Sequence, residues 1–138
     1  MLNHERRLCV REDELEWETW KDPSLKDRSP IIWKTLISQD KTDSSRLVAG
    51  VAEIPVGTLL IRHSHAEEEV YYILEGEGHL ELDGDTIRVT RGTSVFIPGN
   101  AEHALTNTGI RTLKLLYMFP TDSFEDIEYT FPMNESLE

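Results

Sequence analysis

Short segments typical of β-strands follow one another from residue 31 onward, and this pattern constrains the fold more than any other feature of the sequence. Each segment is rich in apolar, β-branched or aromatic residues and is bounded by Gly, Pro, Asn, Asp or Ser. Asp83-Gly84, between alternating apolar residues, is a strong signal for a two-residue hairpin turn. No stretch after residue 30 has a sustained helical periodicity. Many short strands separated by turns predict an all-β sandwich or barrel. The expected strands are residues 31–38, 46–54, 58–63, 69–74, 78–82, 86–89, 94–97, 103–107 and 112–119.

The chain has 138 residues, which suits one domain. Residues 1–30 are highly charged but contain Trp17 and Trp20, so we interpret them as an N-terminal arm that packs on the rest of the protein. Residues 31–138 form the predicted β-domain. Its last part, residues 122–138, keeps aromatic and apolar side chains and is expected to return as one more edge strand.

The charge balance excludes several classes of partner. Lys and Arg total 14 against 26 Asp and Glu, which gives a net charge of −12. Such a surface repels nucleic acid and anionic membranes, and no apolar run reaches the roughly 20 residues that span a bilayer. Because Cys9 is the only cysteine, a disulfide framework and a Cys-rich zinc site are excluded. No apolar segment follows the N-terminus as in a secretory signal, so we predict a cytoplasmic protein.

Four side chains suited to metal binding lie at informative positions. His63 and His65 are two residues apart at the end of an expected strand, so they share one face. Glu69 begins the next strand after a short link, and a hairpin there would bring its carboxylate opposite the two imidazoles. His103 begins a later strand. Imidazole and carboxylate are ligands for Zn, Fe, Mn, Ni or Co.

The spacing around these residues resembles that of the cupin superfamily. The first cupin motif is G(X)5HXH(X)3–4E(X)6G, and every defined position is filled here, by Gly57, His63, His65, Glu69 and Gly76. The second motif is G(X)5PXG(X)2H(X)3N, which the chain matches with Gly92, Pro98, His103 and Asn107. Asn100 stands where the family usually has Gly, and Asn also tolerates the left-handed backbone conformation.

The resemblance covers roughly residues 46–119 and implies a double-stranded β-helix, the cupin jelly-roll barrel. It also implies a divalent transition metal inside the barrel, held by His63, His65, Glu69 and His103. Four ligands on an octahedral ion leave two positions for water, substrate or dioxygen, which favours Fe, Mn, Ni or Co, with Zn as a further candidate. From the family's common dimerisation and the tryptophan-bearing arm, we expect this protein to form a homodimer.

Strand alternation predicts which side chains line the pocket. Tyr71 and Ile73 share the face of Glu69, whereas Tyr72 points away. By the same alternation Leu59 and Ile61 share the face of His63, Leu105 shares that of His103, and Arg62 faces away. Tyr71 is the candidate catalytic residue, because a neighbouring cation favours the ionised phenol, which could then act as a base. Tyr117 and Tyr129 are interpreted as packing residues.

Three functions agree with these features. The first is a lyase that acts on a small organic acid by metal-assisted β-elimination with Tyr71 as the base. Cupins that cleave dimethylsulfoniopropionate resemble this chain in length, in the ligand set and in a Tyr two residues after the Glu. The second is an iron-dependent dioxygenase, and the third is a cupin that binds a small molecule without turnover. A sugar isomerase or epimerase fits the apolar pocket face poorly.

Overall fold

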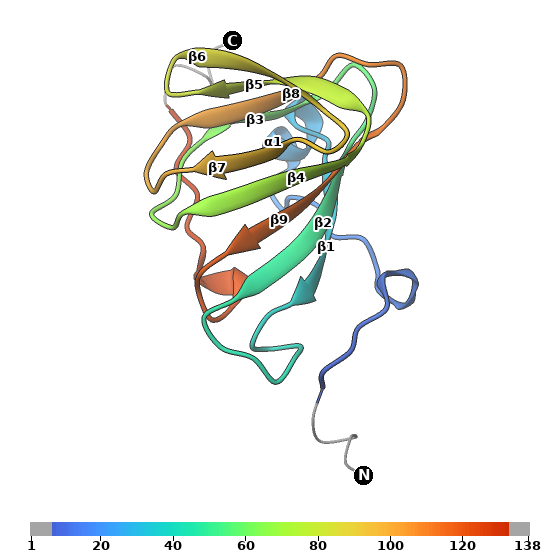
Figure 1. Cartoon of the computed structure of the whole chain (residues 1–138), viewed down its shortest axis with the longest axis vertical. Coiled ribbons are helices and arrows are strands. Elements are labelled where there is room, and N and C mark those ends of the chain that lie inside the picture. The colour runs from blue at the N-terminus through green and yellow to red at the C-terminus, as the bar shows by residue number, and fades with distance from the viewer. Residues whose placement is uncertain (1–6, 133–138) are drawn as a thin grey trace.

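Two antiparallel sheets face each other in the structure, a computed structural model that describes residues 7–132 (Figure 1). The chain passes repeatedly from one sheet to the other, and this is the jelly-roll β-barrel that the sequence predicts. The five-stranded sheet has the order β1 (Ile32–Ile37), β2 (Val48–Ile54), β9 (Leu113–Phe119), β4 (Glu69–Glu75) and β7 (Ser94–Ile97). The four-stranded sheet has the order β3 (Leu59–His63), β8 (His103–Asn107), β5 (Glu77–Leu82) and β6 (Asp85–Thr90).

Turn residues act where the sequence predicted them. Asp83 and Gly84 join β5 to β6 with φ angles of 48° and 91°, the positive values that a type I′ hairpin requires. Asn100, which replaces the usual Gly, has a φ of 67°. The left-handed turn before β8 is therefore preserved, and it leads directly into His103.

The core lies between the two sheets and follows the alternation of the strands. Along β9 every second residue is buried, and along β4 the buried residues Glu69, Tyr71 and Ile73 alternate with Val70 and Tyr72, which are exposed. Tyr72 is 40% exposed and Tyr71 only 2%, which confirms the predicted orientation of this strand. The inner face of β4 therefore points into the barrel.

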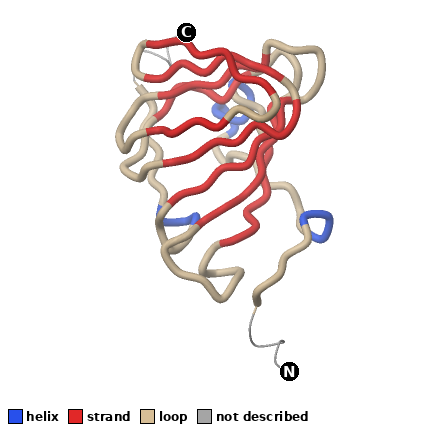
Figure 2. Tube along the Cα trace, in the orientation of Figure 1, coloured by secondary structure: helices blue, strands red, loops and turns tan. Residues whose placement is uncertain are grey.

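The terminal segments contain the short helices and pack against the barrel (Figure 2). The N-terminal arm contains a 3-10 turn, η1 (Glu12–Glu14), and the helix α1 (Pro23–Arg28), whose first turn is capped by the Asp22 side chain. Glu18 of the arm forms an isolated antiparallel bridge with Trp33 of β1. No helix among the described residues is long and apolar enough to cross a membrane.

The C-terminal segment, residues 120–132, differs from the prediction. It contains the 3-10 turn η2 (Phe124–Asp126) and then an isolated bridge between Ser64 and Thr130, in place of the expected edge strand. Figure 1 shows this segment in red, running along one side of the molecule toward the four-stranded sheet. Its aromatic residues pack over the barrel interior without forming a strand, so the apolar pattern that predicted a strand instead reflects this covering role. Residues 133–138 lie outside the described part of the chain.

Candidate metal centre

Three of the predicted side chains come together at one end of the barrel interior. His63 ends β3 and is paired directly with His103, which begins β8. His65 follows β3 and completes a group whose ligand nitrogens all lie within 4.8 Å of one another. All three residues are at most 3% exposed. The histidine cluster is therefore a buried, preformed group of imidazoles, brought together from two strands that are 40 residues apart at His63 and His103.

Each of these imidazoles is oriented by the same local contact. The Nδ1 atom lies within hydrogen-bond distance of a carbonyl oxygen two residues away in the sequence, and a carbonyl can only accept. Nδ1 therefore has the proton, and Nε2 has the lone pair that a metal ion needs. The acceptors are Ile61 O for His63 at 2.8 Å, Glu67 O for His65 at 3.0 Å and Ala101 O for His103 at 2.9 Å.

Glu69 joins this cluster from β4. Its Oε1 lies 3.0 Å from His65 Nε2 and 3.3 Å from His103 Nε2. The contact with His103 lacks hydrogen-bond geometry, and His103 Nε2 is a buried atom without a hydrogen-bond partner among the described residues. Lone pairs that converge in this way need a cation between them, either a proton or a metal ion. The donor set therefore fits a divalent metal, and the histidine cluster supports the predicted cofactor class.

The protonation of the imidazoles agrees with this interpretation. Burial, followed by the nearby His103 and His65, holds the pKa of His63 well below its ordinary value, so His63 is neutral. Burial also acts to lower the pKa of His65, but the hydrogen bond and charge of Glu69 outweigh it and the pKa is raised. The carboxylate thus attracts positive charge to the position between Glu69 and His65.

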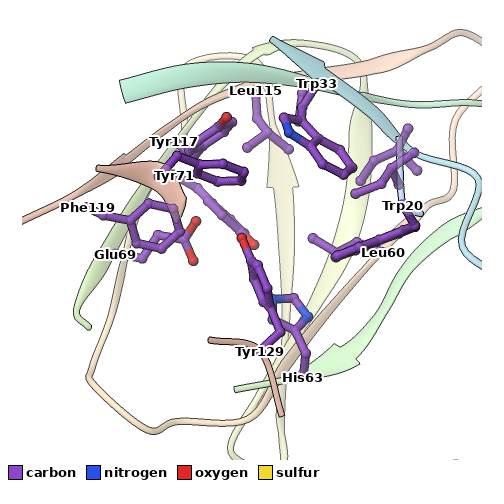
Figure 3. Close-up of a pocket in the computed structure, with 14 residues that line it drawn as sticks. Trp20, Trp33, Leu60, His63, Glu69, Tyr71, Leu115, Tyr117, Phe119 and Tyr129 are labelled. Carbon is purple, nitrogen blue, oxygen red and sulfur yellow. The ribbon is translucent and has the colours of Figure 1, made fainter. Parts of the chain in front are cut away.

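An aromatic cavity adjoins the cluster (Figure 3), and its volume is about 50 Å³. A single water needs roughly 10–15 Å³ on this scale, so the cavity suits only a small molecule. Neither Lys nor Arg is among the described lining residues. Apart from His63 and Glu69, the lining is apolar or aromatic, and it consists of Trp20, Ile31, Trp33, Ala52, Ile54, Leu60, Tyr71, Leu115, Tyr117, Phe119, Phe124 and Tyr129.

Tyr71 lies on the cavity wall, as predicted. Its ring centroid is 6.0 Å from that of His103, and it shares the inner face of β4 with Glu69. Burial raises the pKa of Tyr71 well above its usual value, and the charge of Glu69 adds to this effect. Without a neighbouring cation, Tyr71 is therefore a neutral phenol.

The predicted lining of β3 is wrong because the strand is irregular. Leu60 pairs with Leu105, but the next pair is His63 with His103, so β3 contains one extra residue at this point. Such a bulge shifts the alternation by one position. Leu60 therefore lines the cavity with His63, in place of the predicted Leu59 and Ile61. Arg62 faces away from the cluster as predicted, and it pairs with Glu81 at 2.5 Å.

The terminal segments supply lining residues that the sequence did not assign to the site. Trp20 comes from the N-terminal arm, and Phe124 and Tyr129 come from the C-terminal segment. The ring of Tyr129 lies 5.5 Å from that of His63 and 5.7 Å from that of His65, and Figure 3 shows it beside His63. Tyr129 is therefore part of the site, although its sequence context indicated packing. The only signal in the sequence was the concentration of aromatic residues in both terminal segments.

Comparison with known proteins agrees with this geometry. The cupin domain model matches residues 50–119. The chain belongs to the cupin family. Dimethylsulfoniopropionate lyase DddW of Ruegeria pomeroyi is 39% identical over 101 residues, which cover 73% of this chain and 66% of that protein. Acireductone dioxygenase of Tuber melanosporum is 27% identical over 86 residues, 59% of this chain and 50% of that protein.

The solved structures include a cupin-2 domain protein of Rhodospirillum rubrum, Rru_A2000. It superposes with a TM-score of 0.76 at 18% identity and covers 95% of this cupin and 84% of its own chain. At this level of identity the likeness shows the shared fold. The matched part of this chain spans about two thirds of the length of the lyase and half that of the dioxygenase.

Proposed function

We propose that this cupin is a metal-dependent lyase that acts on a small organic acid by β-elimination. In this proposal His63, His65, Glu69 and His103 hold the metal ion, and Tyr71 is the catalytic base. The cavity supports it most directly, because among the described lining residues the only charged or imidazole groups are His63 and Glu69, and the others are apolar or aromatic. With no Lys or Arg among the described lining residues, a substrate carboxylate has its partner only at the histidine end.

A sulfonium substrate such as dimethylsulfoniopropionate fits the remaining walls. Aromatic faces attract a cation, and none of the lining residues within 7–132 is a Lys or Arg that would repel it. The identity to the DddW lyase supports the same substrate class. The sulfonium leaves as a neutral thioether, which needs no proton donor and is compatible with an apolar wall.

The chemical step uses residues that are already in place. The bound metal would supply positive charge that makes the α-proton of the acid more acidic and favours the ionised form of Tyr71. The Tyr71 oxygen takes the proton from the α-carbon, the electron pair of that bond forms the new carbon–carbon double bond, and the bond from the β-carbon to the leaving group breaks. His63 and His103 are held by their Nδ1 hydrogen bonds, so little rearrangement is needed.

The test combines metal content and turnover. We expect purified protein to contain a divalent transition metal in near-stoichiometric amount and His103→Ala to lose most of it. Tyr71→Phe should keep the metal and lose turnover of dimethylsulfoniopropionate, because only the hydroxyl is removed. A metal-free protein after growth with Fe, Mn or Ni supplied, or an unchanged rate in Tyr71→Phe, contradicts the respective part of the proposal.

A dioxygenase is the second candidate, and the similarity to acireductone dioxygenase favours it. The same ligands would then place substrate and dioxygen side by side. Turnover under nitrogen separates the two functions, because an elimination needs no dioxygen. Tight binding of a small acid without any product would indicate a binding cupin. The cytoplasmic location and the homodimer stay predictions, and sedimentation velocity tests the dimer.

A further inference from the structure

Ser29 of the N-terminal arm lies at the point where β3 departs from regular pairing. It follows α1 directly and is completely buried. Its hydroxyl donates to Leu59 O at 2.8 Å and accepts from Ile61 N at 3.0 Å. One side chain from the arm therefore binds both an acceptor and a donor of the β3 backbone, on either side of Leu60.

The irregularity that Ser29 stabilises determines where His63 points. The extra residue of β3 lies between Leu60 and His63, and a bulge of this kind leaves a backbone group without its partner on the neighbouring strand. Ser29 provides the acceptor for Ile61 N. Without Ser29, the buried N–H of Ile61 would be left without an acceptor, which is unfavourable and would favour a shift of β3 into another register.

The next peptide unit, which contains the carbonyl of the same residue Ile61, holds the imidazole. Ile61 O accepts the Nδ1–H of His63 at 2.8 Å. The contacts thus run from the Ser29 hydroxyl to the backbone of Ile61 and from there to His63. The histidines His65 and His103 use the carbonyls of Glu67 and Ala101, for which no contact with Ser29 is described.

The arm holds Ser29 firmly in place. Its N–H donates to Leu25 O at the end of α1, and its own carbonyl accepts from Ile31 N at the start of the barrel. Leu25, a residue of α1, is buried and so holds the helix against the rest of the protein. The position of the hydroxyl is therefore set by the packing of the arm and is independent of the histidine cluster.

We propose that Ser29 is a positioning residue for the metal centre, which aims His63 Nε2 by holding the backbone of Ile61 through its N–H, while the carbonyl of Ile61 accepts the His63 Nδ1–H. This inference rests on the metal site of the proposed function and adds a residue outside the cupin motifs. It gives the arm a role in the site beyond packing. Residues that support metal ligands in this indirect way typically change metal affinity by about 10–100-fold when they are lost.

The experiment compares Ser29→Ala with Ser38→Ala. Ser38 is a matched control, because it is also completely buried and its hydroxyl also both donates, to Asp40, and accepts, from Phe124 N. Ni²⁺ affinity is measured by competition with a chelator, and the Co²⁺ absorption spectrum reports ligand geometry. We expect Ser29→Ala to weaken Ni²⁺ binding about tenfold and to shift the Co²⁺ bands. Ser38→Ala should change neither, at a similar loss of thermal stability, and Ser29→Thr, which keeps a hydroxyl, should recover most of the affinity.

A second measurement uses the metal-free protein. Nitrogen NMR of the imidazoles should show a change in the His63 Nδ1 resonance in Ser29→Ala and none in that of His103. Unchanged affinity and an unchanged His63 resonance would overturn the inference, as would an equal loss of affinity in Ser38→Ala. Failure of the unaltered protein to bind any metal would instead overturn the proposed function. The NMR comparison would then still decide whether Ser29 orients His63.

Discussion

The two terminal segments both cover the cavity, but they are fastened to the barrel in different ways. The N-terminal arm is held by the Glu18–Trp33 bridge, by buried Leu25 and by the Ser29 hydroxyl on β3. Beyond Ile127, the C-terminal segment is held by the Ser64–Thr130 bridge and by aromatic contacts with Trp20 and the histidines. A cover with few backbone contacts opens at a lower free energy than one that is part of the core.

This difference bears on how a ligand reaches the site. Tyr71 and the three histidines of the cluster are at most 3% exposed, so we expect a covering element to move when a ligand reaches them. Among the described residues, 128–132 form backbone hydrogen bonds to the barrel only at the Ser64–Thr130 bridge. Tyr129 and Phe131 of this segment contact Trp20 at ring distances of 5.5 and 5.9 Å. We therefore expect the arm to behave as part of the folded core and residues 128–132 to behave as the movable cover.

Deleting each terminal segment in turn should give the largest difference in the free energy of unfolding. Deleting residues 1–30 removes Trp20, Leu25 and Ser29. We expect the free energy of unfolding to fall by about 5 kcal/mol or more, which is comparable to the whole stability of many small domains. Ending the chain after Ile127 should cost about 1–3 kcal/mol, since Tyr129 and Phe131 are only half-buried. Urea unfolding measures both, and equal losses would contradict the distinction.

Single aromatic substitutions sharpen the same comparison. Trp20→Ala should cost about 2–4 kcal/mol, because Trp20 contacts Trp33, Tyr129 and Phe131 and lines the cavity. Tyr129→Ala should lower the free energy of unfolding by less, about 1–2 kcal/mol, because Tyr129 is only half-buried and lies in the movable cover. Thermal melts of the two variants at one pH test this, and a larger loss in Tyr129→Ala would reverse the assignment.

A disulfide that joins positions 64 and 130 should prevent residues 128–132 from moving away from the barrel. Ser64 and Thr130 exchange two backbone hydrogen bonds of 2.9 Å. Such pairs have Cα atoms about 5.5 Å apart, which is within the range that a disulfide spans. In a Cys9→Ser background, oxidised Ser64→Cys/Thr130→Cys should be about 2–4 kcal/mol more stable and should take up Ni²⁺ at least about tenfold more slowly.

The reduced form of the same variant is the control, because it contains both new cysteines but no disulfide between them. Its uptake of Ni²⁺ should match that of the Cys9→Ser protein. If the oxidised form takes up Ni²⁺ as fast as the reduced form, the entrance does not lie beneath residues 128–132.

The smallest effect is expected at the outer end of the arm. Glu12 pairs with Lys114 at 2.9 Å, and their side chains are 35% and 21% exposed. Glu12→Gln should therefore cost at most about 1 kcal/mol, less at high salt. Glu77→Gln, which breaks the more exposed pair with Arg88, is the matched control and should cost less still. A loss above about 2 kcal/mol at Glu12 would show that η1 is a structural anchor.

The sequence predicted the strands and turns of the barrel because they depend on local patterns, whereas the meeting of His103 with His63 and His65 was predicted from the resemblance to the cupin motifs. Alternation placed Tyr71 and Glu69 on one face of β4, and turn residues such as Asp83-Gly84 fixed the hairpin between β5 and β6. Glu69 was expected to join the histidines, and the structure brings it within 3.0 Å of His65. The metal ion, its ligand set and the role of Tyr71 stay proposals that metal analysis and mutation will test.

The tertiary structure alone decided the features that depend on contacts between distant parts of the chain. The bulge in β3 places Leu60 on the cavity wall in place of the predicted Leu59 and Ile61. It is stabilised by Ser29, a residue 32 positions away from Ile61. Likewise, Trp20 and Tyr129 meet over the cavity from opposite ends of the sequence. A periodic pattern describes how one strand faces a core, whereas a bulge or a cover depends on which distant group satisfies its hydrogen bonds or fills its space.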